Sequence, residues 1–168
     1  MKKYKMSDET IIVLDKYASD KAILEMKQFC QHGNQSTYDH CLHVAIWSAI
    51  MAERLKLTND KIENVVLGAM LHDYFLYDWH DGRRRKEGIH CWSHPKTALE
   101  NASRRFNLNK RQKNIIRAHM FPATMLHIPS CTEAWIVCLA DKICAVIEYM
   151  NIPNGNKYST IKKRLAII

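Results

Sequence analysis

The stretch Val65-Val-Leu-Gly-Ala-Met-Leu-His72-Asp73 ends an apolar, helix-like segment on a histidine and an aspartate. Two other apolar segments also contain ionisable groups: His40 in Tyr38-Asp-His-Cys-Leu-His-Val-Ala, and Asp141 in Ile136-Val-Cys-Leu-Ala-Asp-Lys. Such groups are rarely placed in apolar surroundings unless they are paired or bind a metal. Three helices that each carry one predict a site assembled across a helical bundle.

Composition sets the broad class of the protein. The 168 residues are 47% hydrophobic, which suits one domain spanning residues 1–168 with a sizeable core. The sequence shows neither a run of 18 apolar residues nor the apolar core of a signal peptide, so we expect a cytoplasmic protein without a membrane span. Six scattered cysteines without a Cys-x-x-Cys pair indicate reduced thiols.

Helical periodicity dominates the chain, and we expect an all-α fold. Ser7 is expected to cap a first helix, and a second runs from about Asp20 to near Gly33. Longer helices are expected from Ser36 or Thr37 to about Leu55, and from Thr58 or Asn59 to His72-Asp73. After a polar loop at about residues 78–92, the remaining helices are predicted to begin at Ser93, at Asn107 or Asn109, and at Thr132, with a short basic helix in the tail.

Imidazole and carboxylate groups together suit divalent ions such as Fe, Mn, Co or Zn. The alternative for each residue taken alone is a satisfied core histidine or a capping aspartate. The ordered set resembles the HD-domain superfamily of metal-dependent phosphohydrolases, over about residues 36–150. The resemblance rests on His40-x-x-x-Val44-Ala45, on Leu71-His72-Asp73 and on Leu139-Ala140-Asp141-Lys142.

That resemblance implies an HD-domain-like helical bundle with a metal site at its centre, held by His40, His72, Asp73 and Asp141. In two-metal members of the family, histidines placed like His94 and His119 hold a second ion, and Asp73 would then bridge the two. One or two divalent ions are therefore expected, with Mg as a further candidate. His43 could orient a ligand as an outer neighbour of the site, or be an ordinary half-buried helix histidine. His127 could complete the ligand set of the second metal. His80 and His90 lie in the polar loop, where a solvated position is favoured over a role in the site.

The resemblance also implies an enzyme that hydrolyses a phosphate monoester or phosphodiester with metal-activated water, with a nucleotide as the expected substrate. We predict catalytic roles for His72 and Asp73, with Asp78, or else Asp81, as general acid. Many family members have a lysine shortly after the His-Asp pair, but this chain has Tyr74-Phe-Leu-Tyr-Asp-Trp79 instead.

Phosphate contacts are therefore assigned to Arg83 and Arg84, within the cluster Arg83-Arg84-Arg85-Lys86, and to Lys142. The aromatic residues Tyr74, Phe75, Tyr77, Trp79 and Trp92 could form a wall for a base, with a place in the core as the alternative.

Two other classes of function stay open. The same ligand types occur in family members that are di-iron oxygenases, so redox chemistry is not excluded. The net charge of +8 also fits a non-catalytic metal-binding or RNA-binding regulatory domain. Nucleic acid is the less favoured partner, because the basic clusters lack interleaved aromatic residues.

Overall fold

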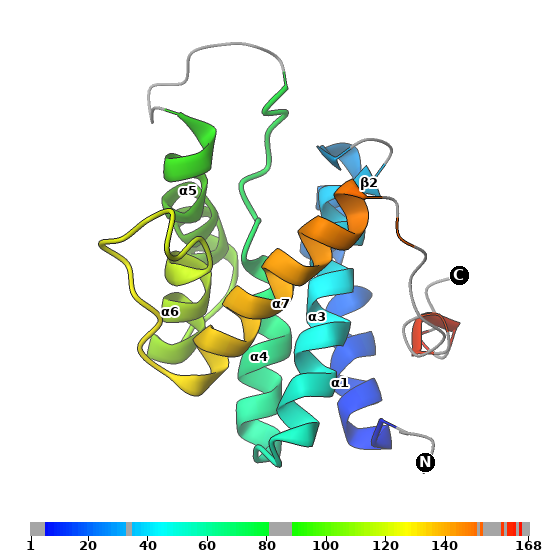
Figure 1. Cartoon of the computed structure of the whole chain (residues 1–168). Coiled ribbons are helices and arrows are strands. Elements are labelled where there is room, and N and C mark those ends of the chain that lie inside the picture. Colours follow the sequence, from blue (N-terminus) through cyan, green and yellow to red (C-terminus); the bar gives the residue numbers. More distant parts are fainter. Residues whose placement is uncertain are drawn as a thin grey trace.

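The chain folds as a helical bundle in which one short hairpin is the exception (Figure 1). The computed structural model describes residues 6–32, 35–80, 89–150, 152, 159, 161–163 and 165. Its elements, in chain order, are α1 (Asp8–Ala18), α2 (Lys21–Leu24), the 3-10 helix η1 (Glu25–Gln28), β1 (Cys30–His32), β2 (Gln35–Ser36), α3 (Thr37–Arg54), α4 (Asn59–Leu71), α5 (His90–Arg105), α6 (Lys110–Ala118) and α7 (Thr132–Tyr149). The all-α prediction is confirmed.

Side-chain caps begin several helices where the sequence predicts them. The Ser7 hydroxyl accepts a hydrogen bond from the Thr10 N–H at the start of α1, and Ser36 does the same for Asp39 at the start of α3. Asn109 forms a reciprocal capping box with Gln112, which places the start of α6 at the second of the two predicted asparagines. These caps satisfy N–H groups that the helix itself leaves unpaired.

The predicted second helix, from Asp20 to near Gly33, is wrong beyond its first turns. Asp20 does cap α2, but the helix tightens into η1 after four residues. The chain then forms β1, which pairs with β2 in an antiparallel hairpin, with Cys30 opposite Ser36. Strands of three and two residues are too short to leave an alternating pattern in the sequence.

The start of α5 also differs from the prediction. The helix begins at His90, three residues before the predicted cap Ser93. The Ser93 hydroxyl donates to the Ile89 carbonyl at 3.0 Å, so it pairs inside the helix rather than capping it. Pro95 is tolerated because the carbonyl that loses its helical donor belongs to Cys91, in the exposed first turn.

The core lies between α3, α4 and α7, with α1 on one side and α5 and α6 on the other (Figure 1). The close approach of α4 to α6 depends on Gly68. A Cβ atom at this position would lie 2.7 Å from Ile115 side-chain atoms. No helix of the described ranges has the length and apolar character that a membrane span requires.

Candidate metal centre

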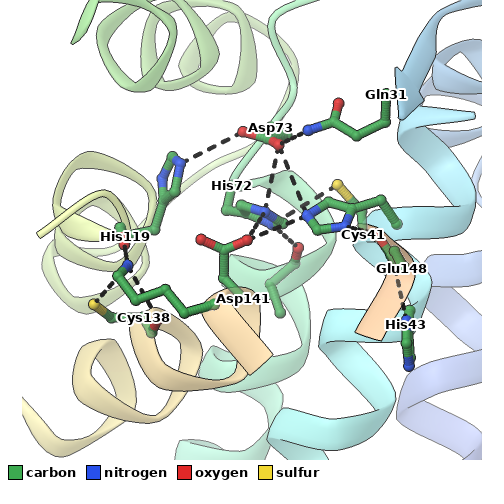
Figure 2. A network of polar contacts seen from close by, with 12 residues as sticks. Gln31, Cys41, His43, His72, Asp73, His119, Cys138, Asp141 and Glu148 are labelled. Carbon is green, nitrogen blue, oxygen red and sulfur yellow. Dashed lines mark hydrogen bonds and ion pairs between the residues drawn. The ribbon is translucent and has the colours of Figure 1, made fainter. Parts of the chain in front are cut away.

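The predicted ligands meet at a cavity of about 750 Å³ in the middle of the bundle. His40 lies in the first turn of α3, His72 caps the end of α4 and Asp73 follows it. His94 lies in the second turn of α5, and Asp141 lies midway along α7. His119, at the end of α6, completes the set (Figure 2). Residues far apart in the chain thus converge because the ends of several helices meet here.

One group of ligand atoms forms around Oδ2 of Asp73. This oxygen lies 3.6 Å from Nε2 of His72 and 4.0 Å from Nε2 of His40. Oδ1 of Asp141 lies 3.2 Å from Nε2 of His40 and 3.6 Å from Nε2 of His72. Nε2 of His40, Nε2 of His72 and Oδ1 of Asp141 lie close enough together to hold one ion, and Oδ2 of Asp73 lies within 4.0 Å of both imidazole nitrogens. This donor set suits a divalent transition metal.

A second group forms around the other oxygen of the same aspartate. Oδ1 of Asp73 lies 3.2 Å from Nε2 of His94 and 3.5 Å from Nε2 of His119. The Nε2 atoms of His94 and His119 are themselves 2.9 Å apart. Asp73 thus presents one oxygen to each group, as a carboxylate that bridges two cations would.

In His40, His72, His94 and His119, the Nδ1 atom that faces away from the site makes a hydrogen bond to the protein. Nδ1 of His72 lies 2.7 Å from the Ala69 carbonyl. The corresponding contacts, each at 2.8 Å, are His94 to the His90 carbonyl, His119 to the Ile116 carbonyl and His40 to the Glu148 carboxylate. Carbonyl and carboxylate oxygens only accept, so Nδ1 of each ring donates its proton, and Nε2 points into the site, where it offers a lone pair to a cation once the ring is neutral.

Unpaired polar atoms show that the donor set fits a cation. Nε2 of His72 and Oδ1 of Asp73 are buried and have no hydrogen-bond partner. With both Nδ1 atoms donating, His94 and His119 turn two lone pairs toward each other. Unpaired buried acceptors and facing lone pairs are costly, and a shared cation would satisfy them.

Electrostatics keep the two aspartates ionised. Burial would raise the pKa of Asp73, but the nearby His72 and His94 rings hold it well below its usual range. Burial would likewise raise the pKa of Asp141, but its hydrogen bond with His40 and the nearby His72 ring lower it. The site thus holds two buried carboxylates that stay negative.

The pKa values of His40 and His119 are shifted in opposite directions. Burial would lower the pKa of His40, but its hydrogen bonds with Asp141 and Glu148 raise it to about 10. Burial lowers the pKa of His119 to about 3, and the neighbouring His72 ring adds to the effect. The His119 ring is therefore neutral, the form in which imidazole binds a metal.

Glu148 is the main residue that the sequence reading missed. It accepts from Nδ1 of His40 at 2.8 Å and from Nδ1 of His43 at 2.6 Å (Figure 2). The Trp47 indole N–H donates to Nε2 of His43 at 3.1 Å, which fixes the proton of the neutral His43 ring on Nδ1. Glu148 follows Asp141 by seven residues, or two helical turns, so helical spacing could have identified it.

Gln31 was also missed, because it lies on the unpredicted strand β1. Its side-chain N–H donates to Oδ2 of Asp73 at 2.7 Å. The hairpin therefore supplies a side chain that reaches the site, as Figure 2 shows.

Several other residues that the sequence suggested for the site lie away from it or have other contacts. Asp78 is largely exposed, pairs with His80 at 3.3 Å and does not line the cavity. His127 is not among the described cavity-lining residues either. Lys142 does line the cavity, but its ammonium group donates to the His119 carbonyl at 2.8 Å. Arg83, Arg84 and the rest of that basic cluster lie outside the described residues, as does Asp81.

The predicted aromatic wall is narrower than the sequence suggests. Tyr74 and Phe75 are buried in the core, and Trp92 is exposed. Trp79 lines the cavity and stacks on His90, with ring centroids 4.9 Å apart and planes 5° from parallel. Of the predicted wall, the Trp79 ring, stacked on His90, thus lies in the described cavity beside the proposed ligands.

The family model of the HD domain matches residues 37–146 of the chain. No curated protein and no solved structure matches the chain. The matched range begins at the first residue of α3 and ends inside α7, so it contains all six residues that surround the site.

Proposed function

Since the chain belongs to the HD-domain family, we propose that it is a metal-dependent phosphohydrolase that acts on a phosphate monoester or phosphodiester, with a nucleotide as the substrate. The observation that carries this proposal is the division of Asp73 between two groups of imidazole nitrogens. A carboxylate shared in this way is the arrangement expected of a two-metal hydrolytic site.

The ligand assignment follows from the two groups of contacts. His40, His72, Asp73 and Asp141 would hold one divalent ion, and His94, His119 and Asp73 would hold a second. Such ions, when bound, supply Lewis acidity that lowers the pKa of water and offsets charge on a phosphoryl group. The protein holds the imidazoles in one tautomer and keeps the carboxylates ionised, so the ligands need little rearrangement.

The cavity supports an organic group beside the phosphate. Most of the surface area of its described lining is apolar, and the apolar residues include Trp79, Met120, Pro122 and Ala123. The stacked Trp79 and His90 rings offer a flat surface on which a nucleobase could lie. The Lys142 ammonium group is held by backbone carbonyls, so we assign it a structural role in fixing α7 to the end of α6.

The test combines metal content with hydrolysis. Purified protein is analysed for bound metal, and cleavage of an aryl phosphate, an aryl phosphodiester and nucleoside monophosphates is measured with and without chelator. We expect metal-dependent phosphate release that Asp73→Asn abolishes. Asp60→Asn, at an exposed position in the first turn of α4, makes the same chemical change away from the site and should leave activity unchanged.

Other outcomes would point to the competing functions. Bound iron with consumption of dioxygen, and no phosphate release from any ester, would overturn the proposal in favour of an oxygenase. Metal-free protein that binds random RNA in a salt-dependent way would overturn it in favour of a regulatory domain.

A further inference from the structure

Helix α7 has an apolar outer face as well as a functional inner face. After Thr132, every exposed residue of the helix is apolar or aromatic. Four of them, together with the C-cap residue Met150, form what we name the α7 stripe. Its residues are 42% to 63% exposed and follow one another at helical spacing: Trp135, Leu139, Ile143, Val146 and Met150. Tyr149 and Ile152 extend the stripe at its end. A helix that is apolar on all sides is normally buried.

The charged residues of α7 do not interrupt the stripe, because each points inward. Glu133 is fully buried beside Arg111, and Asp141 faces the ligand cluster. Lys142 donates to the His119 carbonyl, and the Glu148 side chain is buried against His40. The outer face therefore carries no charge that could match a polyanion, even though the whole chain has a net charge of +8.

We propose that the α7 stripe is the contact surface between two copies of this chain, paired antiparallel about a two-fold axis near Ile143. The spacing supports a self-complementary contact. Trp135 and Met150 lie at equal distances along the chain on either side of the same midpoint as Leu139 and Val146. An antiparallel pair of α7 helices therefore sets Trp135 against Met150 and Leu139 against Val146, which is the pattern of an isologous interface.

The size of the surface is also adequate. From the exposed fractions and the usual areas of such side chains, the stripe with its extension offers on the order of 700 Å² per copy, near the ~800 Å² per partner of a standard interface. The described tail is not available to cover it, because Ile161 and Leu165 are already buried in the core. In Figure 1, α7 crosses the front of the bundle with no described element in front of it.

The test uses charge reversal at the proposed register. Sedimentation of the full chain is measured over a concentration series from about 1 to 200 µM, a range that covers weak and moderate dimers. We expect a monomer–dimer equilibrium for the unchanged protein. The variants Leu139→Glu/Val146→Glu and Leu139→Lys/Val146→Lys should each be monomeric, because the like charges face each other. An equimolar mixture of the two should regain the dimer.

Ile12→Lys provides the matched control, because Ile12 is an apolar residue on α1 that is even more exposed than Leu139 and Val146. It should dimerise like the unchanged protein. Circular dichroism melting of each variant checks that the fold is intact, which we expect because the substituted positions are exposed. A monomer throughout the series would overturn the proposal. A dimer that survives in both double variants, or a mixture that stays monomeric, would also overturn it.

Discussion

Glu148 offers the sharpest test of how the metal centre is held in place. The substitution Glu148→Gln keeps the size of the side chain but replaces one oxygen with an amide NH2 group. In the native protein the two oxygens accept from Nδ1 of His40 and from Nδ1 of His43. The amide has only one acceptor oxygen, so one of the two imidazole N–H groups must lose its partner.

The loss falls on His40 or on His43, and both outcomes are unfavourable. If the amide NH2 faces His40, the ring proton of His40 is driven to Nε2, the atom proposed to bind the ion. If it faces His43, that ring must move its proton to Nε2, where the Trp47 N–H already donates. Losing a buried hydrogen bond to a charged acceptor costs about 1.5–3 kcal/mol. We therefore expect metal affinity to fall roughly 10- to 100-fold.

Titration of the metal-free protein with Co²⁺, followed by calorimetry and by the visible spectrum of the ion, measures the effect. Trp47→Phe is the control, since it leaves the contact between Glu148 and His40 in place and should change affinity less than about threefold. The double variant should bind Co²⁺ more tightly than Glu148→Gln alone, because His43 is then free to change tautomer. Unchanged affinity in Glu148→Gln, or a double variant that is weaker still, would refute this account.

Three further predictions concern metal number, metal-linked stability and packing. The double variant His94→Ala/His119→Ala is expected to bind one divalent ion per chain and the native protein two, as measured by elemental analysis after equilibrium dialysis. Saturating metal at about 100 times its dissociation constant should stabilise the fold by about 2.7 kcal/mol, and a thermal melt with and without chelator should differ by roughly 5–10 °C. Gly68→Ala should lower the free energy of unfolding in urea by about 1–3 kcal/mol, because its methyl group would overlap Ile115. Adding Ile115→Val should recover little of that loss, because valine lacks Cδ1 but keeps Cγ2 and Cβ, which the methyl group would meet at 2.7 and 2.9 Å.

The long helices could be predicted from the sequence because their own residues define them. The stretches that form α3, α4 and α7 combine helical apolar periodicity with a boundary at each end. Their ionisable residues stood out because the neighbouring residues are apolar. His94 and His119 were identified through the resemblance to two-metal HD-domain proteins, and the structure places each of them near Asp73.

The parts that the sequence did not reveal depend on contacts between distant segments. Strand β1 exists because residues 30–32 pair with residues 35–36, and too few residues take part to give an alternating pattern. That strand carries Gln31 to Asp73 across 42 residues of sequence. Glu148 looks like an ordinary charge near a helix end until the packing of α7 on α3 brings it to His40.

Helix polarity explains why His72 and His119 find a backbone carbonyl behind the ring, whereas His40 takes a carboxylate. The last turn of a helix leaves carbonyl groups without a partner. His72 and His119 both sit at such ends, and each donates to the carbonyl three residues earlier. His40 lies in the first turn of α3, where orphan groups are N–H donors, so the acceptor for its Nδ1 comes from Glu148 on α7.

It follows that the two groups of ligands depend on different parts of the fold. Helix α7 holds the His40 ring from both edges, with Asp141 at Nε2 and Glu148 at Nδ1. In the second group, His94 and His119 are oriented by carbonyls of their own helices. Any change that loosens α7 on α3 should therefore weaken the first metal position before the second. The helix that supplies the proposed dimer surface is thus also the one on which the first metal position depends.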